Sequence, residues 1–178
     1  MNEDIILEEE AIAAERSAEF TRLGTVIMRR PIRGLPTLKA PITLSPAATV
    51  HDAVRRMNES SVGCVLIVQA KRLVGVFTER DLLTRVATQG LDLDRTLVEQ
   101  VMTRDPECLT LDDGIAYALN KMSLGGFRHI PLVDDDGSPT GVVAMRNIVD
   151  YIVDLFPNEI LNLPPSPGLS ISRAREGA

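Results

Sequence analysis

The sequence contains no tryptophan, and aromatic residues make up only 3% of its 178 residues. A folded core must therefore be built from aliphatic side chains. No apolar run approaches the roughly 20 residues that a membrane-spanning helix needs, and the acidic N-terminus lacks the positive region of a signal peptide. These absences favour a cytoplasmic protein without a membrane-spanning segment.

Cysteine and histidine are equally scarce, with two residues of each. Cys64 and Cys108 lie in apolar stretches, which predicts two buried free thiols in a reducing compartment rather than a disulfide or a metal pair. His51 is expected on the solvated side of a helix. No Cys–His or Ser–His–Asp grouping, metal-ligand spacing or phosphate-binding glycine loop is visible in the sequence. We therefore expect neither catalysis nor a bound metal.

The sequence has fewer basic residues than acidic ones, 19 against 25, which gives a net charge of −6. This balance argues against general nucleic-acid binding. Residues 1–20 hold seven acids and one base, whereas residues 21–40 hold five bases and no acid. Within residues 1–39 we expect a packing or dimerisation helix over 4–22, followed by a basic, extended arm that carries a strand. The proline-rich residues 157–178 are expected to be disordered.

The most informative feature is an internal repeat. Shifted by 65 residues, the segment 41–68 matches the segment 106–133 at a series of apolar positions. A one-residue insertion in the turn at 134–137 then moves the offset to 66. The matched pairs are Pro41 and Pro106, Leu44 and Leu109, Val50 and Ile115, Ala53 and Ala118, Val54 and Leu119, Met57 and Met122, and then Arg80 and Arg146.

Each copy shows the same pattern of elements. A short strand precedes an amphipathic helix, in which apolar residues recur at spacings of 3, 4 and 7. Two short runs typical of strands buried on both faces follow, and a second helix is expected near 79–89 and 146–155. Such a β-α-β-β-α unit is too small to be stable alone. The sequence therefore predicts one α/β (α+β) domain of two repeats related by a pseudo-twofold axis, with the first repeat and a linker over 40–100 and the second repeat over 101–156.

Three segments stand in register with this repeat. They are 75–82 (Gly-Val-Phe-Thr-Glu-Arg-Asp-Leu), 101–106 (Val-Met-Thr-Arg-Asp-Pro) and 127–134 (Phe-Arg-His-Ile-Pro-Leu-Val-Asp). Together they resemble the tandem cystathionine-β-synthase (CBS) domain pair, or Bateman module. The resemblance implies a regulatory ligand between the repeats, namely AMP, ADP, ATP or an S-adenosylmethionine-like nucleotide, and no required cofactor. It also implies a homodimer of four repeats in a flat disk, and an unidentified regulated partner.

Thr78 and Asp81 have two interpretations. By themselves they predict a helix cap, with Thr78 at the N-cap and an acid in the first turn. With the resemblance, Asp81 accepts hydrogen bonds from two ribose hydroxyls and Thr78 adds a polar contact. The second copy has Ala144 and Asn147 at these positions, so we expect unequal sites. The competent one is expected around Thr78 and Asp81, with a base pocket lined by Met102, Cys108 and Phe127.

Arg128 and His129 begin the first core strand of the second repeat, where the first repeat has Gly63 and Cys64. They form either an exposed strand end with ordinary solvation, or a partner-facing salt bridge, or a cationic site for phosphate oxygens. The resemblance implies the cationic site. Because Asp81 lies in the other copy, the sequence leaves open whether acid and bases serve one site. The leading hypothesis is a module that senses an adenine nucleotide. The alternative is a dimerisation scaffold whose pocket has decayed.

Overall fold

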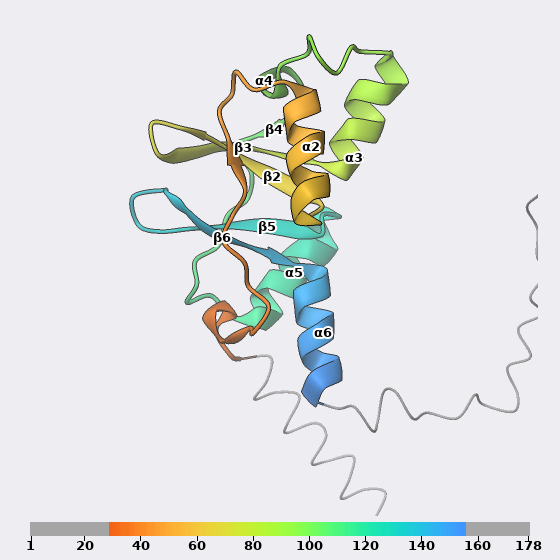
Figure 1. Cartoon of the computed structure of the whole chain (residues 1–178). Helices are drawn as coiled ribbons and strands as arrows, with labels where there is room; N and C mark the ends of the chain where they lie inside the picture. The colour runs from red at the N-terminus through yellow and green to blue at the C-terminus, as the bar shows by residue number, and fades with distance from the viewer. Residues whose placement is uncertain (1–28, 156–178) are drawn as a thin grey trace, which may run out of the picture.

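Two halves of the same topology stack on each other in the computed structural model, which describes residues 29–155 (Figure 1). The first half has the predicted β-α-β-β-α order, the second half has the α-β-β-α part of it, and the α/β (α+β) fold class is confirmed. A 3₁₀ turn, η1 (Ile32–Gly34), precedes both halves. The first half contains β1 (Thr43–Leu44), α2 (Val50–Ser60), β2 (Cys64–Gln69), β3 (Arg72–Thr78), α3 (Glu79–Asp81), the π-helical turn η2 (Leu82–Val86) and the 3₁₀ turn η3 (Ala87–Gln89). The second half contains α4 (Val98–Val101), β4 (Thr103–Arg104), α5 (Ile115–Gly125), β5 (His129–Val133), β6 (Pro139–Ala144) and α6 (Met145–Leu155).

The strands form two small sheets. In the first, the order is β1-β2-β3-β4, with β1 parallel to β2 and the other neighbours antiparallel. In the second, β5 and β6 form an antiparallel hairpin. The strand expected near Leu109 is reduced to a single parallel bridge with Leu132, the counterpart of the β1–β2 pairing in the first half.

Each half has its own aliphatic core, and a third apolar cluster joins them. Cys64, Leu66 and Val76 of the first sheet pack with the partly buried Leu73 and with Val142 of β6. The intervening β2 residues Val65 and Ile67 belong to the core of the first half. The prediction of strands buried on both faces is therefore confirmed for β2. The N–H of Leu73 also donates to the carbonyl of Gly137 across this boundary at 3.0 Å.

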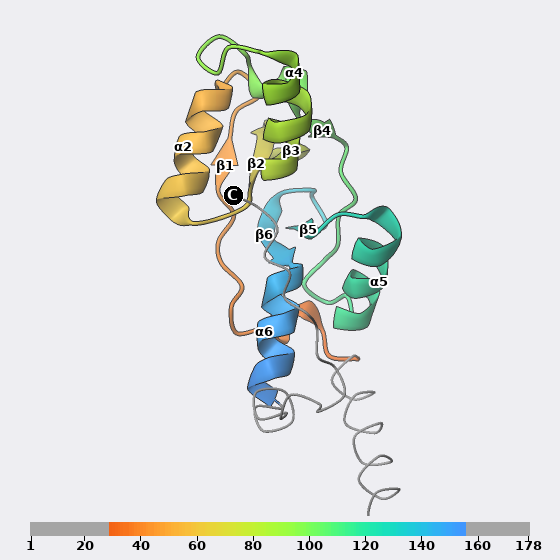
Figure 2. The same ribbon diagram turned by 90° about the vertical axis from the view of Figure 1, so that its right-hand side faces the viewer.

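Two segments are exchanged between the halves. Ile32 and Leu35 lie in the core of the second half, whereas Val98 and Val101 lie in the core of the first. Figure 2 shows the chain running from β1 down to η1, beside the second half. The two segments are related by an offset of 66 residues, the offset that also relates the last helices of the repeats, so the repetition extends back into the basic arm. The predicted helix over 4–22, the arm's apolar stretch 26–28 and the predicted disordered tail lie outside the described residues.

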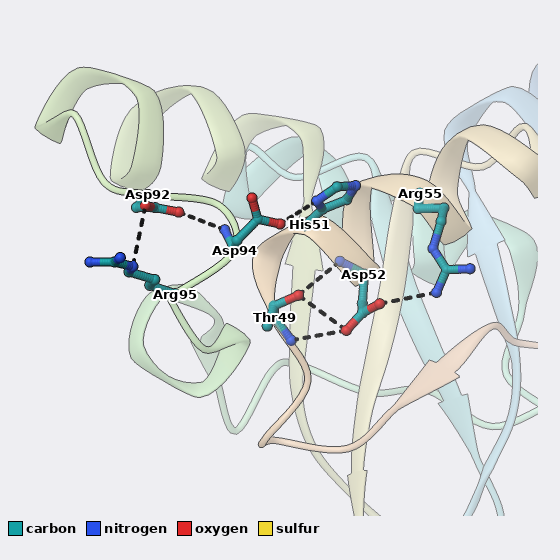
Figure 3. Close-up of polar contacts among 7 residues, drawn as sticks. All are labelled: Thr49, His51, Asp52, Arg55, Asp92, Asp94 and Arg95. Atoms are coloured by element: carbon teal, nitrogen blue, oxygen red, sulfur yellow. Dashed lines mark hydrogen bonds and ion pairs between the residues drawn. The ribbon is translucent and has the colours of Figure 1, made fainter.

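The helices α2 and α3 begin at threonine caps. At the start of α2, Thr49 and Asp52 exchange hydrogen bonds (Figure 3). His51 lies on the exposed side of this helix as predicted, and its Nδ1 lies 2.5 Å from Oδ1 of Asp94 in the following loop. Between residues 29 and 155, no helix combines the length and the apolar character needed to cross a bilayer.

Both cysteines are free, as predicted, but only Cys64 is buried. Cys108 is half-buried in the extended segment before Leu109, and its S–H donates to the carbonyl of Pro106 at 3.1 Å. Burial raises the pKa of the Cys64 thiol to about 12 and also raises the pKa of Cys108. Neither thiol is therefore a ready nucleophile at neutral pH.

The turn between β2 and β3 provides a test of the backbone geometry. Ala70 and Lys71 have φ angles of 49° and 67°, in the left-handed region that costs an L-residue about 1–2 kcal/mol. Turns of this kind favour glycine at the second position. We predict that Lys71→Gly raises the free energy of unfolding by about 1 kcal/mol and the calorimetric midpoint by about 2–4 °C.

The matched control lies in the corresponding turn of the second half. Gly137 has a φ of 79° and has open space where a Cβ would stand. Gly137→Ala should therefore lower the midpoint by a similar amount, through backbone strain alone. An unchanged midpoint in Lys71→Gly would contradict the assigned turn.

Candidate functional site

Two cavities lie at the boundary between the repeats. Cavity one, of about 410 Å³, is bounded by the start of α3, the segment 103–107 and the α5–β5 loop. Cavity two, of about 880 Å³, is bounded by the segment 37–42, the α2–β2 loop and the start of α6. Both volumes suit a small-molecule site. Four residues line both cavities and form a shared wall, namely Gly63, Glu79, Arg128 and His129.

Asp81 is the one charged residue within residues 29–155 that is buried, with 6% of its surface exposed. Its Oδ2 accepts hydrogen bonds from the N–H of Thr78 at 3.0 Å and from the Thr78 hydroxyl at 2.7 Å. The Thr78 hydroxyl oxygen in turn accepts from the N–H of Asp81 at 3.2 Å. The capping interpretation of Thr78 and Asp81 is therefore confirmed, and the ribose interpretation stays a prediction.

A second Thr-x-x-Asp pair shows that capping by itself does not make a site. Thr49 and Asp52 make the same bonds at the start of α2, with 3.1 Å between the Thr49 hydroxyl and Oδ2 of Asp52 (Figure 3). The Asp52 side chain is 43% exposed, however, against 9% for Asp81, and it lines neither cavity. Burial beside a cavity is what distinguishes Asp81.

Arg85 joins Asp81 to the segment between the repeats. Its Nε lies 3.3 Å from Oδ1 of Asp81, one helical turn away. Its Nη1 donates to the carbonyls of Val101 at 3.1 Å and of Met102 at 2.7 Å. These bonds hold the Asp81 carboxylate in one orientation at the edge of cavity one.

Arg128 and His129 lie on the shared wall. Arg128 is exposed and makes no ion pair or side-chain hydrogen bond with any other described residue, so its guanidinium is available to an anion. His129 lies over Gly63, where an added Cβ would stand 3.0 Å from the ring. Burial lowers the pKa of His129, nearby Glu79 opposes this effect, and Arg128 lowers the pKa further.

The α5–β5 loop supplies the apolar side of cavity one. The Phe127 ring lies where a side chain on Gly125 would stand, so glycine is required there. The carbonyl of Gly126, the residue that ends α5, accepts from Nη1 of Arg80 at 2.6 Å and ties the repeats together. The other apolar or ring-bearing lining residues are Val76, Pro106 and Pro131.

Comparison with known families matches these two repeats. The family model described as the CBS domain matches residues 26–88 and 98–154. The chain belongs to the CBS domain family. The resemblance drawn from the sequence motifs is thus confirmed, and each matched stretch covers one of the two CBS repeats.

Relatives place this CBS chain among proteins of different lengths. The CBS domain-containing protein CBSCBSPB3 of Arabidopsis thaliana is 36% identical over 115 residues, which are 65% of this chain and 21% of that protein. The chain thus spans about a fifth of that relative. An uncharacterized 17.7 kDa protein of Acidianus ambivalens is 30% identical, over 63% of this chain and 67% of its own. A CBS domain protein of Pyrobaculum aerophilum, solved in complex with AMP, is 26% identical, covers 70% of this chain and 98% of its own, and has a TM-score of 0.61.

The CBS fold brings together most of the residues that the sequence analysis selected. Thr78, Asp81, Phe127, Arg128 and His129 all line cavity one, although they come from different repeats. The remaining two, Met102 and Cys108, line neither cavity. Met102 is buried over Gly75 in the first core, and the segment after it presents Pro106 and Glu107 to the cavity instead.

Several charged residues of cavity one were not selected from the sequence. They include Arg85, whose spacing of four residues from Asp81 on a helix was a readable signal. Asp105 has a φ of 44° at the turn before Pro106, and Glu107 pairs with Lys121 of α5. Asp105 and Glu107 face cavity one because of tertiary packing, which no local sequence pattern predicts.

Cavity two has different chemistry, as expected from Ala144 and Asn147. Oδ1 of Asn147 accepts from the N–H of Ala144 at 2.9 Å, so the helix cap is retained without a carboxylate. Nδ2 of Asn147 donates to the carbonyl of Thr37 at 3.3 Å and to its hydroxyl at 3.0 Å. Cavity two therefore has an amide, Asn147, at the helix start where cavity one has the carboxylate of Asp81.

The lowered pKa of His129 predicts a pH dependence of stability. Below an unfolded-state pKa of about 6.5, the unfolded chain binds a proton that the folded chain resists, so stability falls as pH falls. We predict that His129→Gln removes part of the decline in thermal midpoint between about pH 7 and pH 5. Parallel midpoint curves for wild type and variant would contradict the assignment.

Proposed function

We propose that this CBS protein is a regulatory module that binds an adenine nucleotide in cavity one and transmits the binding to a partner protein. The observation that carries the proposal is that a buried carboxylate and an exposed guanidinium line the same cavity. Asp81 comes from the first repeat and Arg128 from the second. A ligand that contacts both therefore bridges the repeats.

The lining of cavity one supports a role for each part of such a ligand. Oδ1 of Asp81 keeps acceptor capacity, because its one partner is Nε of Arg85 at 3.3 Å. A carboxylate with spare lone pairs suits a ribose diol, and the Phe127 side suits the flat base. Arg128 and His129 are then the groups that meet phosphate oxygens.

Regulation follows from the bridging geometry. A nucleotide that contacts both repeats favours the arrangement to which it binds more tightly, and shifts the balance only by that difference in affinity. Arg85 contacts both Asp81 and the linker carbonyls, so it is the side chain placed to convey occupancy to the linker. The AMP complex of the Pyrobaculum relative makes AMP the first nucleotide to test, with ADP, ATP and S-adenosylmethionine beside it.

A dimerisation scaffold with a decayed pocket is the second candidate function. It is favoured by the engagement of both Asp81 oxygens within the chain, one in the cap and one with Arg85. Under this alternative the carboxylate serves the helix and the linker only.

Asp81→Asn separates the two candidates. The variant keeps an oxygen for the cap, as Asn147 does at the equivalent helix start, but it loses the charge and one acceptor. We predict that calorimetric titration with AMP, ADP, ATP or S-adenosylmethionine shows an affinity at least about tenfold weaker than wild type. If wild type binds none of the four nucleotides, the scaffold function takes precedence.

Asp52→Asn is the matched control. Asp52 has the same capping geometry as Asp81 and a similar arginine partner, Arg55, but lies on neither cavity. Its replacement should leave nucleotide affinity unchanged. Equal losses in both variants would point to a general effect of a weakened cap and would contradict the assignment of Asp81 to the ligand.

We also propose that the protein acts as a cytoplasmic homodimer. Free thiols suit a reducing compartment. Leu83 of η2 and Leu124 of α5 are 63% and 80% exposed. The Arg80–Gly126 bond holds the two helices that carry them together. Removing these two exposed leucines from water favours association with a second copy of the chain.

The dimer predicts a mass of twice 19.4 kDa by light scattering after size exclusion. Leu83→Glu combined with Leu124→Glu should shift the protein to the monomer, because burying two carboxylates is costly. Leu91→Glu, in the loop after η3, is the control that should leave the mass unchanged. A monomeric wild type would exclude the proposed dimer.

A further inference from the structure

The basic arm makes specific polar contacts with the second repeat. Asn147, at the start of α6, donates both to the carbonyl and to the hydroxyl of Thr37. One turn further along α6, the Tyr151 hydroxyl accepts from Nη1 of Arg30 at 3.1 Å. Between these contacts, the arm residues Ile32 and Leu35 are buried in the second core.

The equivalent positions of the first repeat hold the linker by different means. By the 66-residue offset, Asn147 corresponds to Asp81, Tyr151 to Arg85, and Thr37 to Thr103. In the first repeat Arg85 holds the linker carbonyls and Asp81 stays at cavity one. In the second repeat, Asn147 occupies the position of Asp81 and binds the arm directly.

The amide of Asn147 is what makes this contact possible. An ionised carboxylate is an acceptor only, so an aspartate would cap Ala144 but would repel the Thr37 carbonyl. Asparagine offers an oxygen to the cap and an N–H₂ group to the arm at once. The exchange of Asp for Asn therefore adds a donor as well as removing a charge.

We propose that Asn147 is a positioning residue that latches the N-terminal arm onto the second repeat, and that this repeat has exchanged ribose recognition for holding the arm. The second clause rests on the proposed nucleotide function, whereas the first does not. The arm forms one wall of cavity two from Thr37 to Ile42. The latch therefore leaves one nucleotide site per chain and couples the start of α6 to the segment that leads to residues 1–28.

Limited trypsin digestion without nucleotide tests the latch in the full chain. Lys39 is exposed and lies two residues from Thr37. Asn147→Asp keeps the cap and exchanges the amide donor for a carboxylate, which loses the bond to the Thr37 carbonyl and repels that oxygen, although the Thr37 hydroxyl can donate to it. Cleavage after Lys39, followed by mass spectrometry, should therefore become about 3–10 times faster. Thr37→Val, which loses only the hydroxyl acceptor, should give a smaller increase. Because the unfolded chain lacks these bonds, the global thermal midpoint should fall by about 2–4 °C at most in both variants. Cleavage after the exposed Lys71 of the β2–β3 turn should keep its wild-type rate, whereas a general destabilisation would accelerate cleavage at both sites.

Asp150→Asn is the control, because Asp150 lies one turn from Asn147, pairs with Arg146 and does not contact the arm bonds. It should leave the cleavage rate unchanged. Wild-type cleavage rates in both Asn147→Asp and Thr37→Val would overturn the latch.

Equilibrium dialysis with AMP tests the second clause. One nucleotide bound per wild-type chain supports the exchange of roles, and two per chain overturn it. If none binds, the proposed nucleotide function fails, and with it the second clause, while the cleavage rates still decide whether Asn147 holds the arm.

Discussion

The apolar seam between the two sheets is the contact on which the rest of the structure depends. A half of this size buries too little surface to be stable alone, and the inner face of its sheet must be covered. Cys64, Leu66 and Val76 meet Val142 there, and the exchanged segments η1 and α4 close the remaining sides of the two cores. The same packing brings Asp81 and Arg128 to the edges of one cavity, although 47 positions separate them in the sequence.

The capping of α3 is compatible with the proposed role of Asp81 in binding. Two bonds from Thr78 and the contact with Arg85 fix the Asp81 carboxylate before any ligand arrives. A group that is already ordered loses little conformational freedom on binding, which improves affinity. Asp52 has the same local bonds but a more exposed side chain, and it lines neither cavity. The local motif therefore orients the carboxylate, and the tertiary structure places it beside a cavity.

Duplication has produced one scaffold with two different boundaries. In both repeats a polar side chain in the first turn of the last helix caps the helix start, and that helix holds the segment that leads into the other repeat. In the first repeat, Arg85 donates to the carbonyls of Val101 and Met102, and the Asp81 carboxylate stays at cavity one. In the second repeat, Asn147 donates to Thr37 of the arm, and the Tyr151 hydroxyl accepts from Arg30. The two sides of the seam therefore present different side-chain chemistry, with a carboxylate at Asp81 and an amide at Asn147.

The sequence by itself determined the repeat, the order of elements, the capping role of Thr78 and Asp81, and the inequality of the two copies. All of these depend on spacing along the chain, on short-range bonds or on side-chain chemistry. The tertiary structure alone decided that the arm lies in the second core, that Met102 turns to Gly75 and away from the cavity, and that Arg128 shares a cavity with Asp81. These depend on which surfaces meet when the halves pack, and contacts between distant segments leave no periodic signal in the sequence.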